Sequence, residues 1–167
     1  MSGFGKVASP LPKAQALREM LEGLLGREVT LQTGGEHVDP AGPGGAVVAE
    51  YVSDAMQLHA LIVLDVPAAA HLGASLALIP AAVSQEDARA GELSTDLFDA
   101  IGEVLNVLGA LFNLEGAPHL RLGTVHAPNQ PLPADVASWV MAYVARLDVN
   151  VDVSGYGAGA VSVLIVP

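Results

Sequence analysis

The residues best suited to chemistry in this sequence are Glu103 and Asn106, which lie three positions apart in a segment with helical periodicity. Two side chains at this spacing project from the same face of a helix, so the pair can reach one target together. A carboxylate can pair with a lysine or arginine or act as a base. A carboxamide both donates and accepts hydrogen bonds and can orient a water molecule. Periodicity alone favours a simpler explanation, a solvated helix face without chemistry.

The segment that must position this pair is predicted to be an amphipathic helix. Ser94 or Thr95 can cap its start, and Asp96 and Asp99 place negative charge near the positive end of the helix dipole. With about 100° between successive residues, the apolar side chains share one arc, which comprises Leu97, Ile101, Val104, Leu105, Leu108, Leu111 and Phe112. The opposite arc holds Asp99, Glu103, Asn106 and Asn113.

Two glycines, Gly102 and Gly109, lie beside or within the polar arc. Glycine inside a helix costs about 1 kcal/mol relative to alanine, so something else must offset this loss. One explanation is that the small residues give a partner surface access to the helix.

The spacing Asp99-x3-Glu103-x2-Asn106, followed after 21 residues by Pro128, resembles the phosphatase signature of the CheC/CheX/FliY family of bacterial chemotaxis proteins, in which Asp or Ser opens the motif. The order of the flanking elements is also similar, so that the resemblance covers residues 15–167. The earlier helical segment at 67–79 contains neither Glu nor Asn. A single site is therefore implied, as in CheX, within a CheC/CheX-like fold.

The resemblance implies an enzyme, because these proteins hydrolyse the phosphoaspartate of the response regulator CheY. Carried onto this sequence, Asn106 would orient the attacking water and Glu103 would dock by pairing with the regulator's active-site lysine. Asp99 and Pro128 match motif positions and would shape the site. Mg²⁺ would be supplied by the partner receiver domain, so this chain would bind no cofactor or metal itself. The resemblance also suggests a homodimer formed through sheet edges.

The alternative is a non-catalytic CheC-like binding or scaffold module on the same fold. Such a module would sequester a regulator in chemotaxis or two-component signalling, or help to build a flagellar assembly, without hydrolysis. The presence of both Glu103 and Asn106 favours the phosphatase, since a pure scaffold has no need of both groups at this spacing.

The remaining chain is predicted to form an α/β (α+β) fold, with a largely antiparallel β-sheet covered by helices. Helices are expected at 12–25 and 67–79, and residues 134–141 are ambiguous between a short helix and a strand. We expect residues 84–96 to form a solvated acidic connection. Strands are expected at 28–33, 46–52, 56–66, 119–126, 146–153 and 160–166. In the 146–153 strand, alternation places Arg146 and Asp148 on a wet face.

Composition limits the possible partners and location. The chain has 167 residues with 7 Lys+Arg against 18 Asp+Glu, a formal charge of −11, which disfavours nucleic acid and anionic membranes. It has no cysteine, and its N-terminus lacks the apolar stretch of a signal peptide. We therefore expect one cytoplasmic domain over residues 1–167, with a flexible N-terminus at 1–10.

Three other patterns are expected to be structural rather than functional. The stretch without formal charge between Asp65 and Glu86 is interrupted by Pro67 and Pro80, as in a soluble helix rather than a membrane span. The histidines are scattered without metal-ligand spacing. The segment 73–77 (GASLA) departs from a nucleophile elbow at its last position and falls within a predicted helix.

Overall fold

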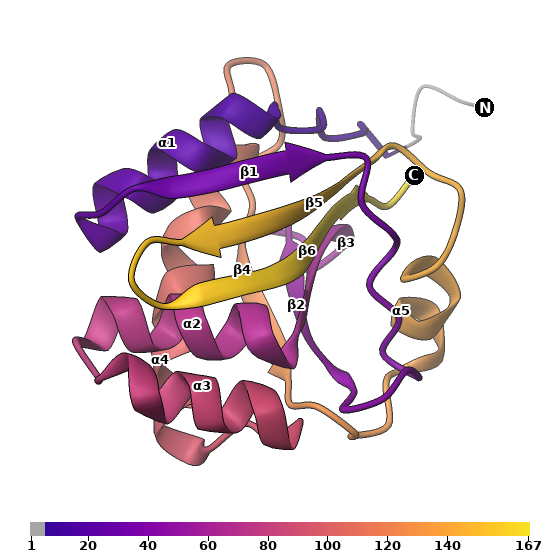
Figure 1. Ribbon diagram of the computed structural model, residues 1–167. Helices are drawn as coiled ribbons and strands as arrows, with labels where there is room; N and C mark the ends of the chain where they lie inside the picture. The colour runs from indigo at the N-terminus through magenta and orange to yellow at the C-terminus, as the bar shows by residue number, and fades with distance from the viewer. Residues whose placement is uncertain (1–5) are drawn as a thin grey trace.

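The computed structural model describes residues 6–167 and contains one six-stranded antiparallel sheet with the strand order β1-β5-β6-β3-β2-β4 (Figure 1). This confirms the predicted α/β (α+β) class and its antiparallel sheet. The strands are β1 (Val29–Thr33), β2 (Ala46–Val52), β3 (Leu58–Asp65), β4 (Arg121–His126), β5 (Arg146–Val153) and β6 (Gly157–Ile165).

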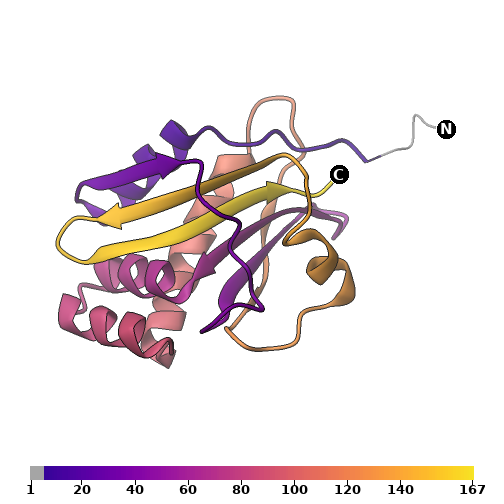
Figure 2. The same ribbon diagram turned by 45° about the vertical axis from the view of Figure 1, so that its right-hand side comes forward.

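Helices cover both faces of this sheet, and the turned view in Figure 2 separates the two layers. They are α1 (Ala14–Leu25), α2 (Val66–Ala77), α3 (Ala81–Ala90), α4 (Thr95–Leu108) and α5 (Ala134–Trp139), with a 3₁₀ turn η1 (Gly109–Phe112) after α4. The alternation along β2 shows how the layers form. Val47, Ala49 and Tyr51 pack with α1, α2 and α4, whereas Ala46 and Val48 pack with α5.

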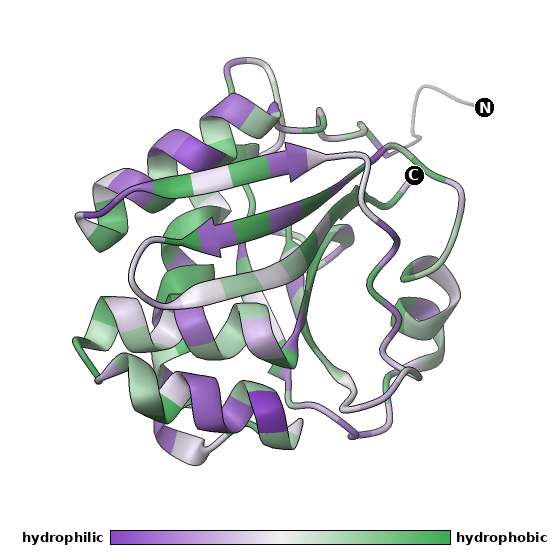
Figure 3. Cartoon of the chain, in the orientation of Figure 1, coloured by the Kyte–Doolittle hydropathy of each residue, from purple (hydrophilic) through white to green (hydrophobic). Residues whose placement is uncertain are grey.

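The segment 84–96 corrects the sequence prediction, because most of what was expected to be a connection belongs to helix α3. Its side chains are largely hydrophilic (Figure 3), and Ser84 is its one fully buried residue. Gly91 ends the helix in the left-handed conformation with φ 68°. A helix held by polar contacts and a glycine cap has no apolar stripe, so periodicity could not reveal it. The ambiguous segment at 134–141 contains the short helix α5.

A second correction concerns β5, where Val149, Val151 and Val153 are buried as predicted but Arg146 and Asp148 are not on a wet face. Their side chains are 7% and 10% exposed and form an ion pair with Arg146 Nε 3.0 Å from Asp148 Oδ2. Ser162 donates a hydrogen bond to Asp148 at 2.6 Å, and the Val38 amide donates to Ser162 Oγ at 3.0 Å. This network ties the 34–45 loop to the sheet.

Helices α2 and α4 meet at Gly73. A Cβ atom at this position would lie 2.9 Å from the carbonyl oxygen of Leu97 and 3.3 Å from the Ala100 Cβ. Only glycine allows this approach, so Gly73 has a packing function inside α2. The segment 73–77 therefore lies within or at the end of a helix and is no strand-to-helix elbow, as predicted.

Lys6, at the start of the described chain, lies beside the C-terminal end of the chain. Of the N-terminus that was expected to be flexible, residues 1–5 lie outside the described residues. Lys6 donates to the carbonyl oxygens of Leu58 and Val166, and Ser9 is buried. Within residues 6–167, no helix combines the length and apolarity needed to span a bilayer.

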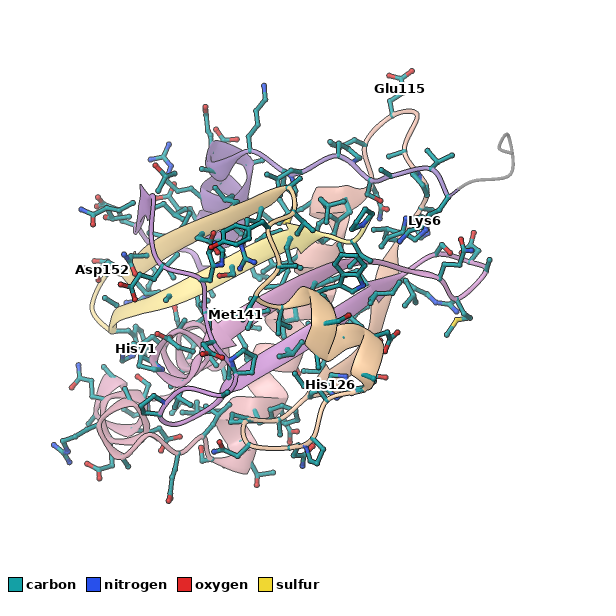
Figure 4. The ribbon with its side chains drawn as sticks, turned by 90° about the vertical axis from the view of Figure 1, so that its right-hand side faces the viewer. Lys6, His71, Glu115, His126, Met141 and Asp152 are labelled. Carbon is teal, nitrogen blue, oxygen red and sulfur yellow. The ribbon has the colours of Figure 1, made fainter. Side chains whose placement is uncertain are left out.

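His71 links α2 to α3 in the interior, at the end of the molecule where Figure 4 also places Asp152. Its Nδ1 lies 3.0 Å from Ser84 Oγ, and Ser84 donates its single proton to the carbonyl of Ala81. Nδ1 must therefore be the donor to Ser84. Burial lowers the pKa of His71, although Asp65 and Asp152 oppose the shift. In the folded protein the ring consequently resists protonation.

This arrangement makes stability depend on pH. Because the pKa of His71 is lower in the folded than in the unfolded chain, the unfolded state binds more protons, and stability is lost as pH falls below about 6.5. We expect His71→Gln to reduce the slope of unfolding free energy against pH between 5 and 7 by up to about 1.4 kcal/mol per pH unit. Urea unfolding at several pH values measures this slope. The exposed His119→Gln is the control, and equal slopes for both variants would contradict the assignment.

Candidate functional site

The three motif residues of α4 share one exposed face. Asp99, Glu103 and Asn106 are all solvent-exposed, while Leu97, Ile101, Val104, Leu105 and Leu108 are buried. This confirms the predicted division of the helix into two arcs. Among residues 6–167, no side-chain hydrogen bond or ion pair engages Asp99, Glu103 or Asn106. Both candidate catalytic side chains are therefore free to meet a molecule from outside.

The start of α4 is fixed by α3 rather than by a capping hydroxyl. Ser94 occupies the N-cap position but its side chain makes no capping bond. Instead the Ser94 amide donates to Asp87 Oδ2 at 2.8 Å, and the Phe98 amide donates to the Ser94 carbonyl at 2.9 Å. The predicted N-cap position is confirmed, whereas its mechanism was missed because Asp87 belongs to the unpredicted helix.

A buried tyrosine holds the turn that carries Asn106. The hydroxyl of Tyr51 on β2 donates to the carbonyl oxygen of Leu105 at 2.6 Å, and its ring packs on Phe112 with centroids 5.0 Å apart. In a regular helix the Gly109 amide would donate to the Leu105 carbonyl oxygen. Here it donates to the carbonyl oxygens of Asn106 and Val107 instead, and the Tyr51 hydroxyl is the donor to Leu105. Burial raises the pKa of Tyr51, which keeps the hydroxyl protonated and able to donate.

Gly109 and Gly102, the two glycines noted in the sequence, have different surroundings in the structure. A Cβ at Gly109, which is buried, would lie 3.4 Å from Tyr51 Cε1, an ordinary van der Waals contact. A Cβ at Gly102 would meet nothing within 4 Å. Gly109 therefore lies against the Tyr51 ring, whereas no contact inside the protein requires glycine at position 102, where glycine costs about 1 kcal/mol of helix propensity.

The exposed face of α4 is acidic. Asp96, Asp99 and Glu103 carry its charge, and the helix contains no basic residue. Asp99 and Glu103 lie four positions apart, where like charges destabilise a helix by about 0.2–0.5 kcal/mol. A cation brought by another molecule would relieve this repulsion.

Pro128, the last residue of the motif, does not lie on α4. It lies two residues beyond the end of β4, half-buried, in a turn where Asn129 has a positive φ of 64°. Asn129 Nδ2 donates to the carbonyl of Gly44 at 3.3 Å, which ties the turn to the loop before β2. The structure thus places Asp99, Glu103 and Asn106 on one helix face, and Pro128 on a turn anchored elsewhere.

The surroundings of the motif do not resemble a small-molecule site. A hollow of about 590 Å³ between the 34–45 loop and the sheet is lined by Asp65 and Asn150, and neither Glu103 nor Asn106 lines it. Within residues 6–167 no group of three or more potential ligand side chains is arranged to hold a metal ion. Small ligands are usually enclosed in concave pockets, whereas an open helix face suits a macromolecule.

Several solved structures share this fold, although no family model and no curated protein matches the chain. The FliM middle domain from H. pylori has a TM-score of 0.56 at 9% identity, covering 91% of this chain and 84% of that one. FliY from Thermotoga maritima has a TM-score of 0.52 at 15% identity, covering 89% and 81%. A chain of the CheX-CheY-BeF3-Mg complex from Borrelia burgdorferi covers 92% and 94% at 11% identity, but its TM-score of 0.48 is too low to support an inference.

The chain therefore has the fold of the FliM middle domain and of FliY. The CheC/CheX/FliY-type fold that the sequence motif suggested is confirmed at this level. At such low identities the likeness extends to the fold alone, so the roles of individual residues must be argued from their own geometry.

The role of Tyr51 can be tested by removing its hydroxyl. We expect Tyr51→Phe to lower the free energy of unfolding by about 1–3 kcal/mol, because the buried Leu105 carbonyl loses its partner. Tyr143→Phe is the matched control, since Tyr143 is 98% exposed. Chemical denaturation measures both, and equal stability of the two variants would show that the buried hydrogen bond does not support α4.

Proposed function

We propose that the protein is a phosphatase that hydrolyses the phosphoaspartate of a CheY-like response regulator. The observation that carries the proposal is the exposure of Glu103 and Asn106 on one face of α4, about one turn apart and without partners among the described side chains. The buried Tyr51 holds the backbone between them. A free carboxylate and a free carboxamide on a fixed helix can enter another protein's active site together.

In the proposed reaction, Asn106 orients a water molecule in line with the phosphorus of the acyl phosphate. The water oxygen forms the new P–O bond while the bond to the aspartyl oxygen breaks, which leaves a carboxylate on the regulator. The water proton leaves with inorganic phosphate. Phosphoryl transfer depends on positioning and charge neutralisation rather than on covalent catalysis, so one well-placed amide can suffice.

Glu103 and Asn106 have different roles in the proposed reaction because one side chain is charged and the other is neutral. Glu103 pairs with the regulator's active-site lysine and thereby docks α4. Asn106 stands nearest the phosphoryl group, where a neutral amide adds no negative charge. Mg²⁺ belongs to the receiver domain in this mechanism, and this chain supplies no metal ligand. Asp99 extends the acidic face one turn before Glu103, and the shaping role that the motif implies for Pro128 would act through the separate turn that Asn129 ties to Gly44.

The proposal includes the setting of the reaction. A phosphorylated CheY-like receiver as partner implies a cytoplasmic chemotaxis or two-component pathway. The sheet has free edges at β1 and β4, and either could pair with a second copy to form the homodimer that the sequence motif suggests. The shared fold with FliY supports a place in this group of proteins.

A non-catalytic binding or scaffold module is the second candidate. The FliM middle domain has the same fold, and FliM from H. pylori is also known in a complex with SpeE, with a TM-score of 0.55 to this chain. The fold therefore also serves in a protein that binds another protein. On this alternative, the acidic face of α4 binds a regulator or an assembly component and leaves the phosphate intact.

The phosphatase can be tested by measuring phosphate release from each CheY-like receiver of the same genome, phosphorylated with acetyl phosphate and Mg²⁺. We expect Asn106→Ala to lower the stimulated rate by about 100-fold or more, because loss of an orienting group has effects of this size. Glu103→Ala should mainly raise KM, because it removes a docking contact. The control is Asn150→Ala, an exposed amide on β5.

Each outcome separates the two candidates. Acceleration by wild type that Asn106→Ala abolishes, with unchanged stability, supports the phosphatase. Saturable binding of a receiver with an unchanged phosphate lifetime supports the binding module. If wild type accelerates phosphate loss from none of the receivers, the enzymatic proposal is wrong.

A further inference from the structure

Gly102 differs from the other glycines that contact or border α4. Gly73 allows a close approach to the Leu97 carbonyl, and Gly109 is buried against the Tyr51 ring. Gly102 is in the helix interior and half-exposed, and a Cβ there would meet nothing within 4 Å. The missing side chain therefore changes only the outer surface of the protein, where it leaves the helix backbone uncovered.

The position of this bare surface relative to Asn106 follows from helix geometry. Asn106 lies four residues after Gly102, so it is one turn further along and about 40° around the axis, while Glu103 is about 60° from Asn106 on the other side. Helical side chains lean toward the N-terminus and cover the preceding turn. The carboxamide of Asn106 therefore projects toward the turn of Gly102, where no side chain crowds it.

The opposite flank of the site is apolar. Val107 is 40% exposed and lies about 40° beyond Glu103 around α4. The exposed face thus has a bare backbone on one side of the polar pair and one exposed valine on the other. All formal charge on α4 is negative, so a partner surface that carries a cation complements this face.

We infer that Gly102 is a positioning residue, at which the phosphorylated partner comes closest to α4, so that its phosphoryl group reaches the Asn106 carboxamide. The inference rests on the proposed function and adds a residue to it. An asparagine side chain is short, and its amide can hold a water at the phosphorus only if the partner approaches the helix backbone. A methyl group at position 102 holds the partner back, and a displacement of about 1 Å can lower a rate about 100-fold.

The test compares Gly102→Ala with Gly23→Ala. Gly23 is an exposed interior glycine of α1, and a Cβ there also meets nothing within 4 Å. Both substitutions should raise the thermal midpoint by about 2–4 °C, because alanine favours the helix. We expect Gly102→Ala to lower kcat/KM for phosphate release about 10–100-fold, and Gly23→Ala to leave it within about twofold of wild type. The substrate is the CheY-like receiver that wild type dephosphorylates fastest.

The stability readout excludes a folding defect, since a more stable protein with lower activity has lost a function of its surface. Wild-type activity in Gly102→Ala, together with the raised thermal midpoint, would overturn the inference. If Asn106→Ala is inactive in the same assay, the proposed function stands and only the role of Gly102 is wrong.

A cross-linking measurement covers the case in which wild type binds a receiver without hydrolysing it. The chain has no cysteine, so Val107→Cys and Gly23→Cys each give one site for a photoactivatable benzophenone. We expect the receiver to cross-link from position 107 and not from position 23, with a yield that falls at least fivefold when Gly102→Ala is added to Val107→Cys. A yield unaffected by Gly102→Ala, or absence of a cross-link from 107, would overturn the inference whether or not phosphate is released.

Discussion

The hydrogen bond from the Tyr51 hydroxyl to the Leu105 carbonyl is the interaction on which the rest of the site depends. It joins β2, the strand next to the β4 edge of the sheet, to the helix at Leu105, between Glu103 and Asn106. Because the bond is buried, water cannot replace it. The 3₁₀ turn η1 follows directly after the end of α4. The two exposed side chains therefore stand on backbone that is fixed from beneath, although within residues 6–167 neither is held by a hydrogen bond or ion pair from another side chain. This is the rigidity that catalysis by positioning requires.

Contacts from several elements of the fold hold α4 in place. Gly73 lets α2 lie against α4, and the alternating residues of β2 and β3 fill the space between the helices and the sheet. Asp87 of α3 fixes the first turn of α4 from its other end. Both ends of the helix are thus attached to different elements, whereas Asp99, Glu103 and Asn106 on its outer face make no side-chain hydrogen bond or ion pair within the described chain. Acidic residues and an uncovered glycine on that face lower the intrinsic stability of the helix, and burial of its inner face compensates for the loss.

The sequence predicted the parts of the fold that depend on apolar periodicity. The two arcs of α4 and the alternation of Val149, Val151 and Val153 were correct, because burial on one side leaves a regular pattern in the chain. Helix α3 was missed because polar contacts and a glycine cap hold it. The pairing of Arg146 with Asp148 was missed because a loop distant in sequence covers them. The motif located Glu103 and Asn106, but no local pattern could show that Tyr51 supports them or that Gly102 borders open space, since both are facts of tertiary structure.

The two hydrophobic clusters lie on opposite sides of one sheet and share strands but no side chains. The network of Arg146, Asp148 and Ser162 seals the second side by anchoring the loop at 34–45. A substitution beneath α5 can thus reach α4 only by displacing strand backbone that hydrogen bonds hold on both sides. Because the two surfaces lie on opposite faces of the sheet and share no side chains, the side chains on either surface can be replaced without removing any contact on the other.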